Sequence, residues 1–287
     1  MRAAAALAAV LVLAGCGATQ WTPAAGPVPP RAALPRFTHV VVVVFENRER
    51  DQIVGNPEAP TFNALLRSGA DITRYDAVTH PSLPNYLALV SGSTHGITSD
   101  CTSCDVSGPS LASQLEAAGR TWKTYAEGLP RPGWDGSVEG LYAKKHDPFL
   151  YFRGVDRSRV VPLTQLAPDV AARRLPDFSL VVPDLCNDMH DCFPETSDRW
   201  LRAHVLPLLR SPALAGGVVF VVFDEGTSDA GGGGHIYAAA AGPAVRPGSV
   251  FAQPTNHYGL LRTIEDAWGL PRLGLAARAR PIAGIWK

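Results

Sequence analysis

A serine stands at the point where a turn is expected to become a helix. The segment 80–86, with sequence HPSLPNY, leads into the apolar residues 87–90, and Pro84 falls in the first turn of a helix predicted over 82–91. We expect Ser82 to be the N-cap of this helix, because serine is a preferred N-cap residue. The first N–H groups of a helix lack partners within it and attract phosphate, so a hydroxyl here could attack phosphorus. A capping serine without any chemical role would produce the same local pattern.

Two predicted strands end in residues that carry oxygen ligands. The apolar runs within 38–45 and 217–223 are typical of strands buried on both faces of a sheet. Ligands of open α/β sheets bind outside the carboxyl ends of the strands, which is where these polar residues would lie. Such oxygens suit a divalent metal ion, although any one acid could equally be a solvated loop residue. The metal ligands predicted on this basis are Glu46, Asn47, Ser82, Asp224 and Glu225.

Three further polar segments could contribute to the same pocket. Asp188 and His190 lie in a loop after a predicted strand over 178–182, and a surface loop held by its two cysteines is the alternative. His235 follows four consecutive glycines, which let a backbone approach a ligand or move as a lid. We expect His235 to face phosphate or to bind metal as a neutral imidazole. His146, in the segment KKHDPF, could bind substrate or be an exposed loop histidine.

These motifs resemble a known group of enzymes. The segments SLPNY (82–86) and THGI (94–97) resemble the nucleophile region of the alkaline phosphatase superfamily. The pairs Glu46-Asn47 and Asp224-Glu225 resemble its phosphoesterase branch, which includes bacterial phospholipases C and acid phosphatases, and the resemblance spans about 39–273. It implies that Ser82 is the nucleophile and that Asn85 contacts the phosphoryl oxygens. It also implies that the metal ligands are Glu46, Asn47, Asp224 and Glu225, with Asp188 and His190 in the region of the other ligands.

The chain departs from the two-zinc members of that superfamily at both acidic pairs. Those relatives carry Asp-His where this chain has Asp224-Glu225, and an Asp where it has Glu46-Asn47. Carboxylate and amide oxygens suit a harder ion such as Ca, Mg or Mn better than zinc. The cofactor is therefore expected to be a divalent metal ion, with Ca, Mg, Mn and Zn all left open and one or two ions allowed.

The expected activity is metal-dependent hydrolysis of phosphate esters through a phosphoserine on Ser82. His190 or His235 would protonate the leaving group, because imidazole titrates near neutral pH. The substrate is a phospholipid, a nucleotide or a small ester, and the sequence does not separate a monoesterase from a diesterase. A sulfate- or phosphonate-ester hydrolase is an alternative, but sulfatases of the superfamily use Cys/Ser-x-Pro-x-Arg, and SLPNY lacks the Arg. A non-catalytic binding lipoprotein is a second alternative, which would not need a nucleophile and a metal set together.

Strands and helices are expected to alternate along the chain. This order predicts an α/β fold resembling alkaline phosphatase, a three-layer sandwich in which helices cover both faces of a mostly parallel sheet. A single domain is expected over 37–287, with an irregular insertion over 127–160. The predicted strands are 38–45, 121–125, 178–182, 217–223 and 236–241, and the predicted helices are 61–68, 82–91, 110–119, 163–172, 198–210 and 256–267.

The N-terminus has the pattern of an export signal. A positive Arg2 precedes an apolar run, and LAGC at 13–16 resembles a bacterial lipobox, so residues 1–15 are predicted to be a lipoprotein signal peptide. Cys16 would then carry lipid, and the Pro- and Ala-rich residues 16–36 would tether the domain to the membrane. The expected location is the outer face of the cytoplasmic membrane, the periplasm or the cell surface. A plain secretory signal is the alternative. Lys and Arg number 26, as do Asp and Glu, so no nucleic-acid partner is expected, and we expect a monomer.

Four cysteines remain beyond the lipobox. Export would place them in an oxidising compartment, where an even number indicates two disulfides. Three pairings are possible, and we prefer the local pairs as loop staples. A Cys₄ zinc site is the alternative, but only the first pair has the CxxC spacing. The preferred pairs are Cys101 with Cys104 and Cys186 with Cys192.

Overall fold

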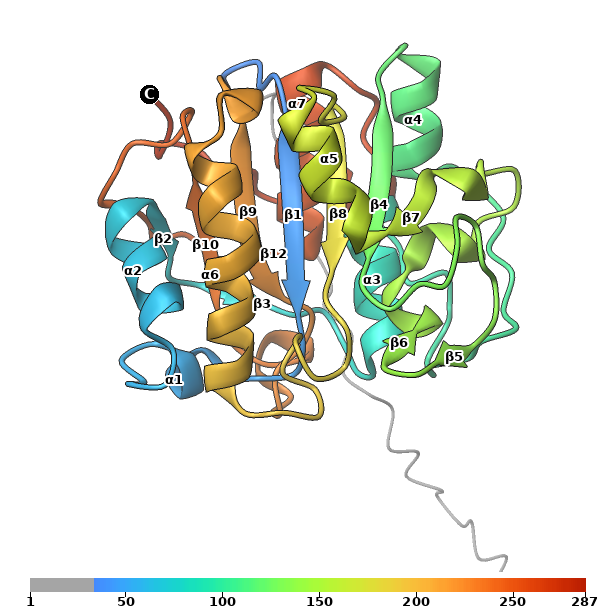
Figure 1. Ribbon diagram of the computed structural model, residues 1–287, viewed down its shortest axis with the longest axis horizontal. Helices are drawn as coiled ribbons and strands as arrows, with labels where there is room; N and C mark the ends of the chain where they lie inside the picture. The colour runs from blue at the N-terminus through green and yellow to red at the C-terminus, as the bar shows by residue number, and fades with distance from the viewer. Residues whose placement is uncertain (1–33) are drawn as a thin grey trace, which may run out of the picture.

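The computed structural model describes residues 34–287, which are built around one eight-stranded sheet (Figure 1). The expected mixed α/β class, with a mostly parallel sheet, is confirmed. Only β10 runs antiparallel to its neighbours β9 and β2 within this sheet. Its strands, in spatial order, are β11 (Ser249–Phe251), β2 (Ala70–Ile72), β10 (Ala238–Ala241), β9 (Val218–Phe223), β1 (Val40–Phe45), β8 (Phe178–Val182), β4 (Trp122–Ala126) and β7 (Val160–Pro162).

The register of the central strands decides where the chain can place polar groups. Every residue of β1 and β9 is buried, as expected for apolar strands covered on both faces. The two strands are parallel and in step, with Phe45 opposite Phe223. The next residues, Glu46 and Asp224, therefore leave the sheet side by side at its carboxyl edge. The Asp224 N–H still donates to the Phe45 carbonyl at 2.9 Å, which extends the alignment by one residue.

Helices cover both faces of the sheet, as predicted. Figure 1 shows α5 and α6 in front of the sheet and α3 and α7 behind it. All ten residues of α3 are buried, because the helix packs against α7, α4 and the 3-10 turns over 144–151. The helices are α1 (Arg50–Ile53), α2 (Pro60–Ser68), α3 (Ser82–Ser91), α4 (Leu111–Ala117), α5 (Leu166–Ala171), α6 (Pro194–Arg210) and α7 (His257–Trp268).

Most predicted elements are present, and the differences fall where local signals are weak. The predicted helix over 163–172 is a 3-10 turn at 163–165 followed by α5, and α6 begins four residues earlier than expected because Pro194 suits a first helical position. The insertion over 127–160 is not irregular throughout. It holds a small hairpin, β5 (Val138–Glu139) and β6 (Tyr142–Ala143), and several 3-10 turns.

Several short strands were not predicted. Strands of two or three residues are too short to show a hydrophobic period, so only their pairing identifies them. They are β2, β7, β11 and the pair formed by β3 (Tyr75–Asp76) and β12 (Thr255–Asn256). Within residues 34–287, no helix is both long enough and apolar enough to cross a bilayer. The predicted signal peptide, the Cys16 lipidation site and nearly all of the 16–36 tether lie outside the described residues.

The start of α2 is capped by a carboxylate from another helix. Asp198 of α6 accepts hydrogen bonds from the Thr61 and Phe62 N–H groups at 2.6 and 3.2 Å, and from the Thr61 hydroxyl at 2.8 Å. Asp198→Ala should lower the free energy of unfolding by about 2 kcal/mol, because it leaves buried donors without an acceptor. Urea denaturation would measure the loss, and the exposed Asp51→Ala is the control. Equal stability of the two variants would contradict this role for Asp198.

Candidate active site

Acidic side chains from three segments meet at the carboxyl edge of the sheet. Glu46 follows β1, Asp224 and Glu225 follow β9, and Asp188 lies in the loop after β8. All four are buried, and the backbone N–H of Glu46 donates to the Asp188 carbonyl at 2.8 Å, which joins the β8 loop to β1. Two groups have ligand atoms within 4.8 Å of one another and could hold a metal ion. The first is Glu46, His146 and Asp188, and the second is Glu46, Asp224 and Glu225.

The Ser82 hydroxyl lies against two of these acids. Its Oγ is 3.0 Å from Glu46 Oε2 and 3.2 Å from Glu225 Oε1, so the hydroxyl proton has a carboxylate acceptor in either direction. The prediction that Ser82 is the N-cap was wrong. The N-cap is Pro81, and Ser82 is the first helical residue of α3, which turns its side chain away from the helix N–H groups and toward the acids.

An acid already occupies part of the N-terminal end of α3. The Leu83 N–H donates to Asp100 Oδ1 at 2.9 Å, and the other oxygen of that carboxylate pairs with Lys145 at 3.0 Å. One of the N–H groups expected to attract phosphate is therefore satisfied by the protein itself.

Without a cation, the buried carboxylates of the acid cluster repel one another. Burial raises the pKa of Glu46 well above its ordinary value, and the nearby charges of Asp224 and Asp188 raise it further. Burial likewise raises the pKa values of Asp188 and Asp224. Carboxylates that repel one another in a buried site favour either protons or a bound cation.

Three buried polar atoms in the cluster have no hydrogen-bond partner. They are His146 Nε2, Asp188 Oδ2 and Asp224 Oδ2. His146 Nε2 lies 3.2 Å from Glu46 Oε1, and its Nδ1 lies 3.2 Å from Asp188 Oδ2, but the angles are not those of hydrogen bonds. Unsatisfied oxygen and nitrogen atoms that converge in this way fit a divalent metal ion. The donor set of this site therefore agrees with the predicted cofactor.

His146 belongs to the cluster, although it was predicted only as a substrate-binding residue. Its ring is buried and stacks on Tyr86, with ring centroids 5.3 Å apart and planes 13° apart. Burial lowers the pKa of His146 well below its usual value, which keeps the imidazole neutral and able to bind metal. The Tyr86 hydroxyl donates to Glu46 Oε1 at 2.7 Å, so the same two rings border and orient the central acid. The sequence signal for this role was weak, because His146 lies in a segment without periodicity.

His80 is a site residue that sequence reasoning left undecided. Its Nδ1 donates to Glu225 Oε2 at 2.5 Å, and its Nε2 donates to the Ser228 carbonyl at 3.0 Å. The bond to Glu225 is the largest cause that raises the pKa of His80 to about 9, so the ring carries a positive charge at neutral pH. His80 thus holds Glu225 beside Ser82. The sequence signal for this role of His80 was its position two residues before Ser82.

Asn85, one of the two asparagines predicted at the site, is bonded to the backbone of the turn before Ser82. Asn85 is buried and accepts hydrogen bonds from the Val78 and Thr79 N–H groups at 3.0 and 3.3 Å. It also donates to the Thr79 and Pro81 carbonyls at 2.7 and 3.2 Å. This engagement favours a role in holding the turn before Ser82 over the expected phosphate contact.

Asn47 reaches the cluster through its backbone. Its N–H donates to Asp224 Oδ1 at 3.3 Å, while its side-chain oxygen accepts from Arg48 at 3.1 Å. Metal binding by the Asn47 amide stays a prediction. His257 of α7 supports the same acid from the other side, because its Nε2 donates to the Asp224 carbonyl at 2.5 Å.

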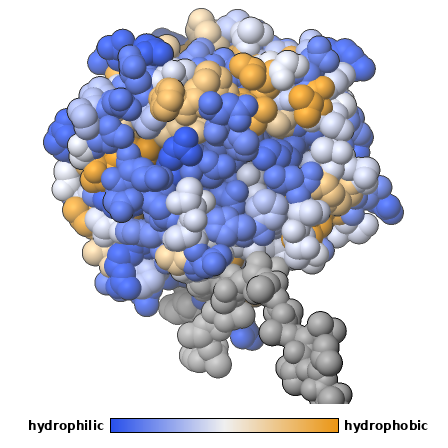
Figure 2. All heavy atoms as spheres, turned by 90° about the horizontal axis from the view of Figure 1, so that it is seen from below, coloured by the Kyte–Doolittle hydropathy of each residue, from blue (hydrophilic) through white to orange (hydrophobic). Residues whose placement is uncertain are grey.

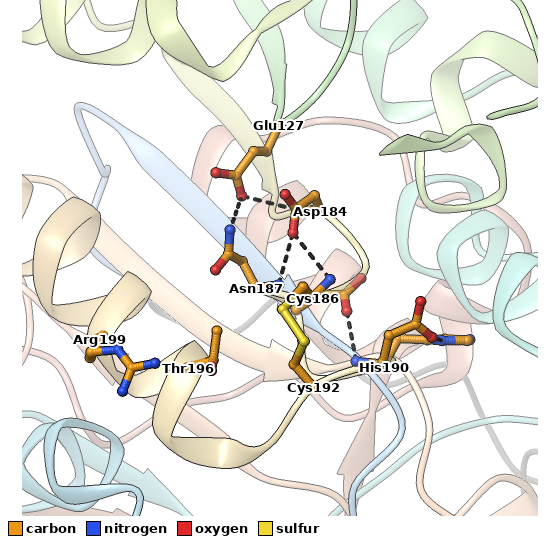
Figure 3. Close-up of a disulfide and its surroundings, with 10 residues drawn as sticks. Glu127, Asp184, Cys186, Asn187, His190, Cys192, Thr196 and Arg199 are labelled. Atoms are coloured by element: carbon orange, nitrogen blue, oxygen red, sulfur yellow. Dashed lines mark hydrogen bonds and ion pairs between the residues drawn. A yellow bond between two sulfur atoms is a disulfide. The ribbon is translucent and has the colours of Figure 1, made fainter. Parts of the chain in front are cut away.

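Hydrogen bonds and a disulfide hold the loop that carries Asp188 (Figure 3). Asp184 Oδ1 accepts from the Cys186 and Asn187 N–H groups at 3.1 and 2.8 Å. Glu127, just after β4, accepts from the Asp184 N–H and the Asn187 amide, both at 3.1 Å. The disulfide between Cys186 and Cys192 closes the loop. The preferred local pairing is confirmed, because Cys101 also pairs with Cys104.

The two histidines predicted as proton donors lie in different surroundings. His190 is partly exposed, with Nδ1 2.6 Å from Asp191 Oδ1 and its ring centroid 6.1 Å from that of His146. It therefore lies at the margin of the acid cluster. His235 does not join either metal-binding group. Its Nε2 is 2.9 Å from the Thr73 carbonyl, and its N–H donates to Glu49 Oε2 at 3.0 Å, so its roles as a ligand or proton donor stay predictions.

Comparison with known proteins decides the family. The profile of the Phosphoesterase family matches residues 57–271, which include every site residue named above except the segment that follows β1. The chain belongs to the phosphoesterase family. Its chemistry is therefore the hydrolysis of phosphoric esters, and its relatives are named as phosphatases.

Similar curated proteins come from bacteria and fungi. The chain is 39% identical to a phosphatidylinositol-3-phosphatase of Mycobacterium tuberculosis, over 98% of this chain and 94% of that protein. It is 28% identical to an acid phosphatase of Aspergillus fumigatus, over 73% of this chain but only 51% of that protein. A solved member of the alkaline phosphatase superfamily from Vibrio parahaemolyticus shares the fold, with a TM-score of 0.60, 16% identity, and 86% of this chain and 70% of that one covered.

Binding of a divalent ion should stabilise the folded protein through the acid cluster. A ligand that binds only the folded state at a hundred times its Kd adds about 2.7 kcal/mol, so the melting temperature should rise with Mn, Mg or Ca. Asp224→Asn should remove most of this rise, whereas Asp191→Asn, on the exposed side of the β8 loop, should keep it. Differential scanning calorimetry with and without chelator would make the measurement. The same metal-dependent rise in both variants would contradict the assigned cluster.

Proposed function

We propose that the protein is a metal-dependent phosphomonoesterase that acts through a phosphoserine on Ser82. The observation that carries this proposal is the position of Ser82 Oγ, at the start of a buried helix and within 3.2 Å of both Glu46 and Glu225. A serine used only for capping would bond to its own helix, which Ser82 does not do.

The residues around Ser82 supply the parts of a two-step displacement. The hydroxyl proton passes to Glu225 or Glu46 as Oγ attacks phosphorus, and the bond from phosphorus to the ester oxygen breaks. His190, partly exposed beside the cluster, gives its proton to the departing oxygen. Water then attacks the phosphorus of the phosphoserine and gives a proton to His190, while the bond from phosphorus to Oγ breaks and Oγ regains its proton from the carboxylate. His80 holds Glu225 beside Oγ, because it donates a hydrogen bond to that carboxylate.

The proposed metal site combines the two groups of side chains whose ligand atoms converge at the carboxyl edge of the sheet. Glu46, Asp224 and Glu225 would hold one ion, and His146 and Asp188 with Glu46 would hold a second or extend the first. A divalent ion there supplies positive charge that lowers the pKa of the serine hydroxyl and offsets the charge on the phosphoryl oxygens. Glu46 is common to both groups, so we expect its loss to disturb either arrangement.

A phosphorylated inositol lipid is the substrate we favour. The support is the 39% identity, over nearly the whole of both chains, to a protein named as a phosphatidylinositol-3-phosphatase. The sulfatase alternative is disfavoured by Tyr86, which stands where that motif has Arg and whose hydroxyl is bonded to Glu46. Export, lipidation at Cys16 and a monomeric state remain part of the proposal, on the sequence pattern alone.

Removal of the Ser82 hydroxyl should abolish turnover. Ser82→Ala should lower kcat for p-nitrophenyl phosphate by about 10³-fold or more, because the nucleophile is lost. Ser91→Ala is the matched control, since Ser91 ends the same helix and bonds only locally, to the Leu87 and Ser93 carbonyls and His95. Acid-quenched parent enzyme should carry phosphate on Ser82, which mass spectrometry of the peptide would detect. Turnover by Ser82→Ala near that of the parent would overturn the proposed nucleophile.

A further inference from the structure

Large hydrophobic side chains are exposed at few places among residues 34–287, and three of these four places lie on segments joined to the loop that carries Asp188. The exposed fractions are 79% for Phe193, 59% for Val138, 46% for Leu141 and 58% for Val250. Val250 lies on β11, the outermost strand at one side of the sheet. The other three lie on segments that project from the carboxyl edge. Single exposed hydrophobic residues are common, so the question is whether these three form a unit.

A chain of contacts joins the three residues to the loop that carries Asp188. The Leu185 N–H donates to the Leu141 carbonyl at 3.0 Å, which fastens the β5–β6 hairpin to this loop. Val138 lies on the other strand of the hairpin, opposite Ala143. Phe193 directly follows Cys192, whose disulfide partner is Cys186. Figure 1 shows the hairpin and the start of α6 along the same lower edge of the molecule, toward which β1 points.

The segment before Phe193 is held by a disulfide and hydrogen bonds. The exposure of the Phe193 side chain is therefore not the result of a loose loop. The disulfide closes the loop, and the bonds from Glu127 and Asp184 hold its first half (Figure 3). Phe193 is also the N-cap residue of α6, and its carbonyl accepts the Thr196 N–H at 3.0 Å. The same loop therefore presents Asp188 inward to the acid cluster and leads into Phe193, whose backbone is held while its side chain faces solvent.

We propose that Val138, Leu141 and Phe193 form a docking edge that enters the surface of a phospholipid bilayer and brings the active site to a lipid head group. The proposal rests on the proposed phosphatase function and extends it to a substrate that stays in the membrane. The phosphate of such a lipid must reach Ser82 while its acyl chains remain in the bilayer. An apolar edge at the margin of the site meets this requirement, whereas a soluble ester would not need it.

The form of this surface fits a lipid better than a protein partner. Figure 2, which views the molecule from below, shows a mainly hydrophilic face with hydrophobic groups in separate patches. Protein interfaces need a continuous buried patch of roughly 800 Å² on each side. Separate apolar side chains among polar ones suit the interfacial region of a bilayer, where apolar groups insert and polar neighbours stay hydrated.

The test compares one head group in two physical states. The substrates are dibutanoyl phosphatidylinositol 3-phosphate in solution and long-chain phosphatidylinositol 3-phosphate in phosphatidylcholine vesicles. The enzyme is the chain from residue 16 onward with Cys16→Ser, so that no lipid anchor contributes. Phe193→Ser and Leu141→Ser should each lower the rate on vesicles by about tenfold, because less apolar area enters the bilayer, and should leave the rate on the soluble lipid unchanged.

Val250→Ser is the control, because it removes another exposed hydrophobic side chain, on β11 at the outer side of the sheet. It should change neither rate. Cosedimentation with phosphatidylcholine vesicles that contain no phosphoinositide should fall in Phe193→Ser and not in Val250→Ser. Equal vesicle rates and equal cosedimentation in these two variants would overturn the docking edge. Loss of turnover on soluble esters by the parent protein would count instead against the proposed phosphatase, so the two failures are distinguishable.

Discussion

The repulsion among buried carboxylates at the carboxyl edge of the sheet is the constraint on which the rest of the site depends. Glu46, Asp188 and Asp224 converge because β1 lies between β8 and β9 in parallel register. Burial and mutual repulsion raise the pKa of Glu46, and the cluster needs positive charge to be ionised at neutral pH. Within residues 34–287, the cation that pairs directly with an acid of the site is His80, through Glu225, and atoms of His146 and two acids have no hydrogen-bond partner. This shortage of cations explains why the site fits a metal.

Three acids of the cluster are each bonded by a residue from another segment. His257 binds the Asp224 backbone, Tyr86 binds Glu46, and His80 binds Glu225. The Asn85 side chain is hydrogen-bonded to the backbone of the turn that precedes Ser82 and holds this turn in place. These contacts come from several separate segments of the chain. The positions of the acids are therefore fixed before a metal ion or substrate binds. Catalysis by displacement at phosphorus benefits from such preorganisation, since groups already in place need not be ordered in the transition state.

The family assignment and the local structure both indicate hydrolysis of phosphoric esters. The residues of the site differ from the two-zinc pattern at two positions. A glutamate stands after Asp224 where those relatives have a histidine, and it serves as a partner of both Ser82 and His80. The histidine of this site comes instead from the insertion, as His146. The site therefore combines mainly oxygen donors with one neutral imidazole, a set that suits harder divalent ions.

Local signals in the sequence determined most of the scaffold. The valine-rich runs of β1 and β9 and the start of α3 at residue 82 were predictable, because apolar runs and proline positions act over a few residues. The acids after β1 and β9 were also identifiable, since the edge of a parallel sheet gathers whatever follows its strands. The local disulfides followed from the short separation of their cysteines.

Only the tertiary structure decided which side chains meet. His146 and His80 join the cluster, while the His235 ring faces the Thr73 carbonyl and the Asn85 amide binds backbone. The orientation of these side chains depends on packing between distant segments, which are 145 positions apart for His80 and Glu225 and 162 for His235 and Thr73. Sequence alone determined which residues could do the chemistry. The three-dimensional packing selected among them, because hydrogen bonds and burial depend on neighbours in space and not in the chain.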